Sequence, residues 1–222
     1  MTEAQNNYFK DSKLLDSNNE LQVFYHATKE KFDSFDKEFI GKKHGASFGE
    51  GFYFSTSPIP AYGENIAVYL DVKNPYVLDL VNKENLFDFM KKLNIDKDVF
   101  LQKVKSNPRN LKACICATLM STGNRDLQGL KDNGYDGLVI KNTFMATVGY
   151  IDKEVIVFEP NQIKSVDNLY PTKSDNFKDN SAEYFKQKGI SPMDAAIQMA
   201  KDKKAMNVKT NTKEINKEKE RE

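Results

Sequence analysis

Three polar side chains have types and positions that suit ligand chemistry. His26 ends a run of β-forming residues, 21–25 (LQVFY), and small residues follow it, so it is a candidate ligand contact. Tyr53 lies inside the short run FYFS, and Glu154 opens another β-forming run, EVIVF. Each also has a plain structural explanation: a surface histidine at a strand end, a half-buried core tyrosine, and a strand-edge charge that opposes aggregation.

The residues around Tyr53 favour a ligand contact. Gly49 and Gly51 precede it, and glycine permits backbone angles that are closed to other residues. Because strand side chains alternate, the two phenylalanines of FYFS would share one face, while Tyr53 and Ser55 share the other. The tyrosine ring would then be held on a stiff element, beside backbone that a flat ligand can approach closely.

Strands and helices must position these residues, and the periodicity of the chain predicts both. Alternating or β-branched runs predict strands at 21–25, 52–55, 67–72, 76–80, 135–140 and 154–158, with 162–165 pairing at a sheet edge. Apolar residues at three-to-four spacing predict helices at 84–93, 99–104, 111–120 and near 127–130. The same spacing of Phe32, Phe35 and Phe39 indicates packing rather than an aromatic binding box.

Composition excludes several classes of protein. Lys and Arg number 33 and Asp and Glu 32, so the net charge does not indicate nucleic acid or a membrane surface as a partner. Cys114 and Cys116 lie one residue apart in an apolar run, which fits neither a zinc site nor a disulfide framework and is typical of reduced core cysteines in a cytosolic protein. No apolar run is long enough to span a membrane, and the first residues lack a signal-peptide pattern.

The two ends of the chain are more polar than the middle. We predict a polar leader at 1–19, one main domain at 20–166 and an appendage at 167–222. Within the appendage, 167–180 has the composition of a linker. Ser191 and Pro192 are typical of a helix start, and a short amphipathic helix through 206 would dock on the domain or bind a partner. Residues 207–222 are expected to be disordered or a solvated helix.

The segments that carry the three candidate residues resemble the signature segments of a known family. FYHATKEKF, GEGFYFSTSPIPAY and KEVIVFEPNQIKS are similar to those of ADP-ribosyltransferases of the histidine–tyrosine–glutamate class, which includes diphtheria toxin and the poly(ADP-ribose) polymerases. With YLDVKNPYVLDL between them and NGYDGLVIKN before the last strand, the layout is closer to compact bacterial and phage domains, some of which lie in polyvalent phage proteins. The resemblance spans roughly residues 20–166.

The resemblance implies an α+β fold: a split, mostly antiparallel β-sandwich with peripheral helices, which binds NAD as a substrate in a cleft and needs no metal. It implies that His26 bonds the adenosine-side ribose and that Glu154 binds the nicotinamide-side ribose. Tyr53 and Tyr62 would sandwich the nicotinamide ring.

The same match assigns the remaining donor-site residues. The backbone of Ala27 would pair with the nicotinamide carboxamide, although glycine is usual at this position, and Thr28 fits the hydroxyl residue usual after it. Ser55 and Ser57 are candidates for a further carboxamide contact. The reaction would pass through an oxocarbenium-like centre, which a carboxylate at Glu154 would stabilise.

The implied activity is mono-ADP-ribosyl transfer to an acceptor, with a protein as the expected acceptor. The alternatives are an NAD glycohydrolase toxin and a non-catalytic NAD- or peptide-binding module of the same fold. The expected location is the cytoplasm, of the producing cell or of a host into which a bacterial or phage effector is delivered.

Two loops are expected to surround this site. The basic loop 42–45 (KKHG) would contact a phosphate or form a solvated turn. The predicted loop 141–152 immediately precedes Glu154 and carries Phe144, Met145 and Tyr150, apolar side chains that suit docking of an acceptor. Their packing back onto the domain is the alternative.

Overall fold

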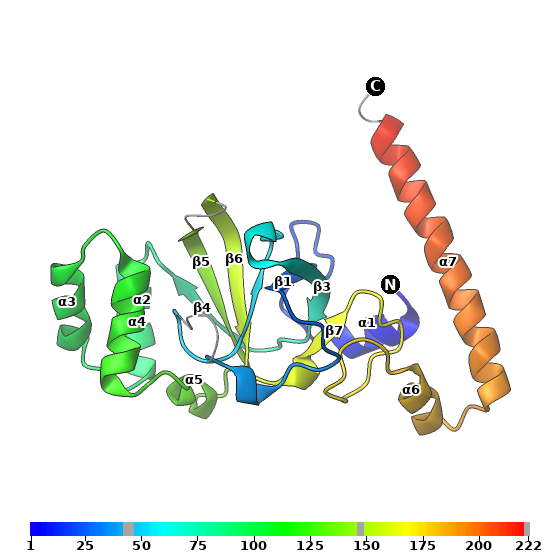
Figure 1. Cartoon of the computed structure of the whole chain (residues 1–222), viewed down its shortest axis with the longest axis horizontal. Helices are drawn as coiled ribbons and strands as arrows, with labels where there is room; N and C mark the ends of the chain where they lie inside the picture. Colours follow the sequence, from blue (N-terminus) through cyan, green and yellow to red (C-terminus); the bar gives the residue numbers. More distant parts are fainter. Residues whose placement is uncertain (42–46, 146–148, 220–222) are drawn as a thin grey trace.

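The computed structural model describes residues 1–41, 47–145 and 149–219, and the side chains of these residues except 144–151 and 207–219. The fold is α+β, as the resemblance implied (Figure 1). The strands are β1 (Phe24–Thr28), β2 (Phe52–Ser55), β3 (Glu64–Leu70), β4 (Pro75–Asp79), β5 (Gly137–Met145), β6 (Gly149–Val157) and β7 (Ile163–Ser165). The α-helices are α1 (Glu3–Phe9), α2 (Lys83–Lys92), α3 (Lys97–Ser106), α4 (Leu111–Thr122), α5 (Gln128–Asp132), α6 (Ser181–Gln187) and α7 (Pro192–Lys219).

The seven strands form one mixed sheet in the order β4-β5-β6-β2-β1-β3-β7. All neighbours are antiparallel except β4 and β5. The two fully described central strands, β1 and β2, share a single register pair, Tyr25 with Ser55, whereas β1 and β3 share five. The sheet is therefore nearly divided between β2 and β1, in agreement with the split that the resemblance implied.

Sequence periodicity located most elements to within a few residues, but the predicted loop 141–152 was wrong. The predicted packing is confirmed for Phe35, which is 4% exposed, and for Phe32, which packs against the same buried cluster, whereas Phe39 ends the 3-10 turn Lys37–Phe39 and is 62% exposed. The predicted loop 141–152 is a β-hairpin, because β5 and β6 stay paired as far as Met145 and Gly149. The side chains of Phe144, Met145 and Tyr150 lie outside the described residues.

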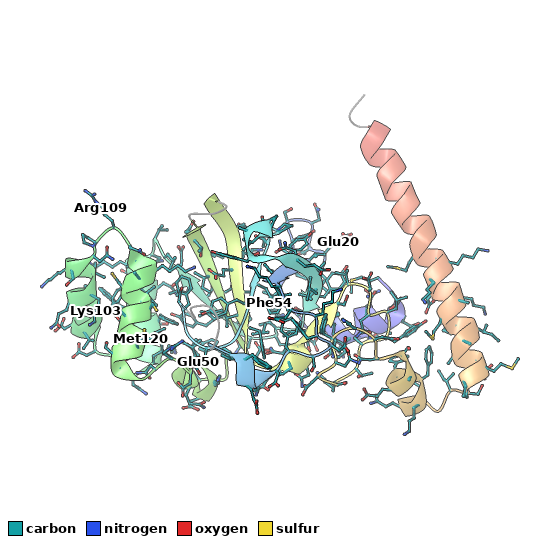
Figure 2. All side chains as sticks on the ribbon, viewed as in Figure 1. Glu20, Glu50, Phe54, Lys103, Arg109 and Met120 are labelled. Atoms are coloured by element: carbon teal, nitrogen blue, oxygen red, sulfur yellow. The ribbon has the colours of Figure 1, made fainter. Side chains whose placement is uncertain are left out.

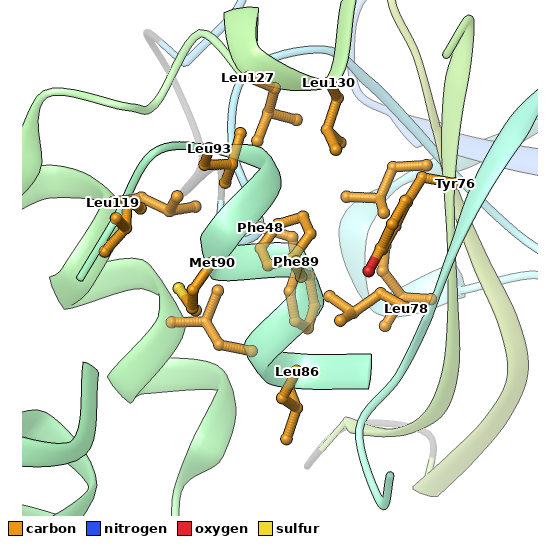
Figure 3. Close-up of a cluster of buried hydrophobic side chains, with 14 of the residues drawn as sticks. Phe48, Tyr76, Leu78, Leu86, Phe89, Met90, Leu93, Leu119, Leu127 and Leu130 are labelled. Atoms are coloured by element: carbon orange, nitrogen blue, oxygen red, sulfur yellow. The ribbon is translucent and has the colours of Figure 1, made fainter. Parts of the chain in front are cut away.

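One face of the sheet is covered by helices α2 to α5, and the core between them is called the helix-side core here (Figure 3). It includes Leu78, Ile140 and Ile156 from the strands and Phe89 and Leu119 from the helices. Tyr53 packs against this core. Figure 2 shows the helical layer, marked by Lys103, Arg109 and Met120, at one end of the molecule, with Phe54 near the middle of the sheet.

The opposite face carries the second core, called the aromatic core here. It gathers Phe24, Phe35, Phe52, Phe54 and Phe177 with β-branched residues of the strands. Because Phe52 and Phe54 lie on this face and Tyr53 on the other, the predicted alternation of β2 is confirmed.

The segment 167–180, which we expected to be a linker, is packed against the domain instead. Phe177 is 1% exposed in the aromatic core, and the ammonium of the fully buried Lys164 donates to the carbonyls of Ser174 and Asn176. Asn168 and Asn180 are buried and bonded to each other, 2.9 Å apart. Polar residues stay buried here because their hydrogen bonds are satisfied inside the protein.

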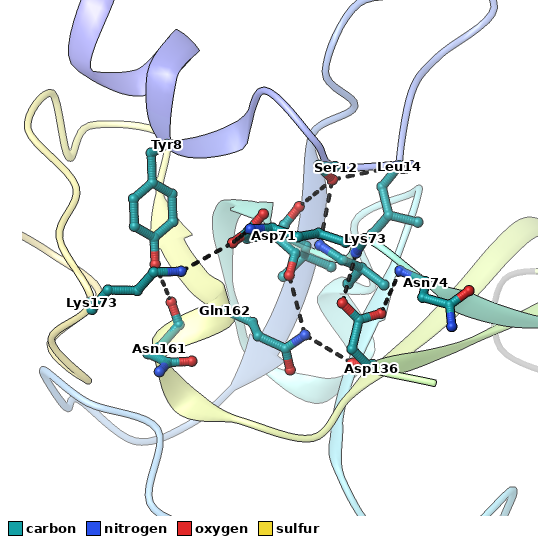
Figure 4. Close-up of polar contacts among 12 residues, drawn as sticks. Tyr8, Ser12, Leu14, Asp71, Lys73, Asn74, Asp136, Asn161, Gln162 and Lys173 are labelled. Atoms are coloured by element: carbon teal, nitrogen blue, oxygen red, sulfur yellow. Dashed lines mark hydrogen bonds and ion pairs between the residues drawn. The ribbon is translucent and has the colours of Figure 1, made fainter. Parts of the chain in front are cut away.

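The predicted leader also packs against the domain. Helix α1 has a capping box on Thr2, and Gln5 donates to the carbonyls of Val166 and Asn168. The hydroxyl of Tyr8 donates to the carbonyl of Asn161, beside Lys173, whose ammonium lies 3.6 Å from Asp71 (Figure 4). Helix α1 and segment 167–180 therefore both pack at the β7 edge of the sheet. The domain boundaries at 19 and 166 stay predictions.

Helix α7 is longer than the expected 191–206 helix. Its first turns pack through Ala195 and Met199 on Tyr170 and Phe185, and Asp202 accepts a hydrogen bond of 2.7 Å from Tyr170. The rest of the helix extends on its own beyond α6 and α1 (Figure 1). Among the described residues, no helix is long and apolar enough to cross a membrane.

Candidate active site

Strands β2 and β6 place Tyr53, Ser55 and Glu154 on one face of the sheet. Ser55 is the register partner of Glu154, and Tyr53 is the partner of Ile156, two residues further along β6. Glu154 is only 7% exposed, and Ile140 flanks it on β5. A carboxylate on a central strand, surrounded by apolar residues of the helix-side core, is not explained as an edge-strand charge.

The hydroxyl of Tyr53 joins β2 to the segment before it. It accepts a hydrogen bond of 3.1 Å from the backbone N–H of Phe48 and donates to the carbonyl of Gly49. Burial raises the pKa of Tyr53, and nearby Glu154 raises it further. Gly49 has φ of 114°, and a β-carbon there would collide with Leu127, so this glycine permits close packing of the segment.

Helix α4 contributes a residue that the sequence did not single out. The ammonium of Lys112 lies 3.4 Å from Oε2 of Glu154 and 5.0 Å from the centre of the Phe48 ring. Burial raises the pKa of Glu154, and the charge of Lys112 opposes that rise. Tyr53, Phe48, Lys112 and Glu154 thus form a connected set of contacts from three separate parts of the chain.

His26 lies on the other face, in aromatic surroundings. Its ring centre is 5.0 Å from that of Phe35 and 5.5 Å from that of Phe54, both in the aromatic core. Its Nδ1 lies 2.9 Å from the carbonyl oxygen of Tyr53. Since a carbonyl only accepts, Nδ1 carries the proton and Nε2 is the acceptor nitrogen of the neutral ring. Burial lowers the pKa of His26, which favours this neutral form.

The contact between His26 and Tyr53 lies where the sheet divides. The ladder between β1 and β2 has its pair at Tyr25 and Ser55, and the carbonyl of Tyr53 faces β1 beyond it. The imidazole accordingly takes the place of a backbone donor, and it links the two halves of the sheet. The structure therefore connects His26 to Tyr53 through the backbone, with the two rings in different cores.

The remaining predicted donor-site residues are Ala27 and Thr28 at the end of β1 and Ser55 at the end of β2. Ala27 has extended strand backbone and pairs with Asn65, so its β-carbon causes no strain. The hydroxyl of Thr28 accepts from the N–H of Glu30 at 3.0 Å and closes the turn after β1. The hydroxyl of Ser55 donates to the carbonyl of Ser57. These two hydroxyls are therefore already engaged in hydrogen bonds within the chain.

Tyr62 differs from Tyr53 in its surroundings. It ends the 3-10 turn Pro60–Tyr62 and is 44% exposed, and Gly63 after it packs against the carbonyl of Thr28 at the end of β1. Neither tyrosine takes part in a ring contact with another described residue. A nicotinamide sandwich between the two rings stays a prediction, as do the roles of all the site residues.

Sequence reasoning missed Phe48 and Lys112 as parts of this site. Phe48 precedes the glycine-rich stretch and is fully buried. Lys112 lies in the first turn of α4, after the N-cap Asn110, where a cation opposes the helix dipole. That unfavourable placement was a signal the sequence offered. The basic loop 42–45 lies outside the described residues. Within the part of the chain that the structure describes, no cluster of His, Cys, Asp and Glu is arranged to hold a metal ion.

A divided, mostly antiparallel sheet with a histidine, a tyrosine and a buried glutamate on β1, β2 and β6 is the arrangement expected of an ADP-ribosyltransferase. A family model described as ADP-ribosyltransferase in polyvalent proteins matches residues 16–173. The chain belongs to this family. A search for similar proteins among curated sequences and solved structures finds no match.

Proposed function

We propose that the protein cleaves the nicotinamide–ribose bond of NAD and transfers the ADP-ribose to an acceptor, with Glu154 as the group that stabilises the transition state. The observation that carries this proposal is a buried carboxylate on a central strand, held within one connected set of contacts with Tyr53. The family supports ADP-ribosyl transfer as the general activity.

The chemistry requires a negative group more than an acid. When the glycosidic bond breaks, its electron pair goes to the nicotinamide nitrogen and neutralises it, and positive charge develops on the ribose carbon. The leaving group needs no proton, so an ionised Glu154 would act by electrostatic stabilisation in a largely dry site. The acceptor then forms a bond to the ribose carbon and loses its proton.

The neutral form of His26 suits the donor-side role. With Nδ1–H engaged by the carbonyl of Tyr53, Nε2 can accept a hydrogen bond from a ribose hydroxyl. The backbone of Ala27 lies one residue further along β1, beyond the Tyr25 pair, where a carboxamide could pair with it. These features support NAD as the donor.

The proposal is tested with NAD labelled in the adenylate part. Wild type and Glu154→Gln are incubated with labelled NAD and a bacterial lysate, and labelled protein, labelled nucleic acid and free ADP-ribose are separated. We expect labelled protein from the wild type and at most traces from the variant. Free ADP-ribose alone would indicate a glycohydrolase, and equal products from both proteins would contradict the role of Glu154.

A further inference from the structure

Lys112 occupies a position that helix stability does not explain. It is the second residue of α4, whose N-cap Asn110 bonds the N–H of Ala113, and no acidic residue lies in the first turn. The N-terminus of a helix carries partial positive charge, so a lysine there costs free energy unless a tertiary contact compensates. The compensating contact in this protein is Glu154.

The ammonium of Lys112 has two contacts, one with Glu154 and one with the ring of Phe48. The ammonium of Lys112 lies 3.4 Å from Oε2 of Glu154 and 5.0 Å from the ring centre of Phe48, which is fully buried. The position of Phe48 is fixed in turn by a hydrogen bond that its backbone N–H donates to the hydroxyl of Tyr53. The side chains of Lys112 and Glu154 are 27% and 9% exposed, so the pair is poorly screened by water.

The geometry leaves Glu154 able to serve a substrate. The lysine contacts one oxygen, Oε2, at a distance longer than the 2.7–2.9 Å of a tight charge-assisted bond. A carboxylate has about four acceptor positions on two oxygens, so a ribose hydroxyl can still be accepted. A loose, single contact fits a group that sets the charge of Glu154 without blocking it.

Other polar groups lie on the elements around this pair. Ser55 of β2 is the register partner of Glu154, and Tyr53 of the same strand is influenced by Cys116 of α4 and by the charge of Arg125. The cation that contacts Glu154 within the described chain is Lys112. Burial of the carboxylate favours its neutral form, and the neutral form would lose the electrostatic stabilisation described above.

We infer that Lys112 is a positioning residue that keeps Glu154 ionised for the reaction, so that helix α4 contributes to catalysis through Glu154. This inference rests on the proposed function. It assigns to a residue outside the three signature strands the task of setting the pH range in which the enzyme works.

The test is the rate of nicotinamide release from NAD between pH 5 and pH 9 for wild type, Lys112→Met, Lys112→Arg and the control Lys105→Met, an exposed lysine of α3. We expect Lys112→Met to move the acidic limb of the pH–rate profile to higher pH. On that limb the rate of nicotinamide release falls about tenfold for each pH unit of the move. At high pH its rate should stay within a few-fold of wild type. The pH–rate profile of Lys112→Arg should have its acidic limb at the wild-type position, and the profile of Lys105→Met should match wild type.

An unchanged pH profile in Lys112→Met would overturn the inference, and so would a faster rate at every pH, which would mean that the lysine competes with the cationic substrate. A second readout does not depend on activity: the Glu154 carboxyl carbon is followed by ¹³C NMR during pH titration of wild type, Lys112→Arg and Lys112→Met. A higher pKa of Glu154 in the methionine variant supports the inference, and an equal pKa overturns it. If Glu154→Gln releases nicotinamide as fast as wild type, the proposed function fails, whatever the titration shows.

Discussion

The two faces of the sheet hold the candidate residues in opposite kinds of surroundings. On the helix-side face, Glu154 is buried next to a cation, and its polar contacts continue through Phe48 to Tyr53. On the other face, His26 is packed among phenylalanines, and its hydrogen bond goes to a backbone carbonyl. Burial disfavours charge on both groups, but the carboxylate has a counter-ion. Burial therefore raises the pKa of Glu154, with the charge of Lys112 opposing that rise, whereas burial lowers the pKa of His26.

The largest effect on the contrast between the two faces is expected from deleting the segment that completes the aromatic core on the His26 face. A chain that ends at Asn168 loses Phe177 from that core and both carbonyls that bind the buried ammonium of Lys164. Loss of a buried phenylalanine costs about 3–5 kcal/mol and an unpartnered buried charge several more, which is comparable to the whole stability of a typical domain. We expect this chain to be unfolded in circular dichroism melts.

The matched control for that truncation is a chain that ends at Met206. It keeps the contacts of α7 through Met199 and Asp202. The midpoint of its thermal unfolding, measured by circular dichroism, should lie within a few degrees of the wild-type value. If the chain that ends at Asn168 is folded, segment 167–180 is a linker, as the sequence predicted, and is not needed for the stability of the domain.

Two variants separate the contribution of the Tyr53 hydroxyl from that of its ring. Tyr53→Phe removes the partner of the Phe48 N–H and the Gly49 carbonyl, and should lower the free energy of unfolding by about 1–3 kcal/mol. Because the ring is kept, NAD affinity should change little. Tyr53→Ala should also weaken NAD binding by about 1–2 kcal/mol, measured by calorimetry.

Tyr62→Ala should weaken NAD binding as Tyr53→Ala does. Tyr69→Ala, whose ring packs on Phe9 of α1, should leave it unchanged. Equal losses in all three alanine variants would mean that ordinary core tyrosines had been assigned to the donor site.

The two faces should respond to pH with opposite signs. The pKa of His26 is lowered on folding, so the unfolded chain binds its proton first, and stability is lost as the pH falls below about 6.5. The pKa of Glu154 is raised, so the folded chain binds its proton first, and stability falls as the pH rises from about 4.5 through the folded value. Urea unfolding from pH 4 to pH 8 measures both effects.

Single variants separate these contributions. Relative to wild type, His26→Gln should remove part of the acid-side loss, and Glu154→Gln should remove part of the loss on raising the pH. Parallel pH curves for wild type and His26→Gln would contradict a histidine that is neutral in the folded protein.

The smallest expected effect concerns the acceptor. The β5–β6 hairpin extends beyond Glu154, and we predict that its residues Phe144 and Met145 dock the acceptor. Replacing both with serine should reduce acceptor labelling several-fold and leave hydrolysis of NAD unchanged. Equal losses of both activities, together with a lower melting temperature, would indicate packing instead.

The sequence predicted what depends on local periodicity and missed what depends on distant partners. The alternation of FYFS predicted that Tyr53 and Ser55 share a face, and EVIVF placed Glu154 on a strand, because side chains alternate in every strand. The contact of Lys112 with Glu154 joins residues 42 positions apart, so no local pattern contains it. Segment 167–180 was misread because hydropathy does not register polar side chains whose hydrogen bonds are satisfied inside the protein, as with Asn168 and Asn180.

The most direct test of the account compares nicotinamide release from NAD by Glu154→Gln and by Glu159→Gln. Both variants replace a carboxylate with an amide near the end of β6, but Glu159 is 52% exposed and paired with Lys37 at the surface. We predict that Glu154→Gln lowers the rate by about a hundredfold or more, as expected for the loss of one preorganised electrostatic group, and that Glu159→Gln stays within about twofold of wild type. Equal rates for the two variants would contradict a catalytic role for Glu154.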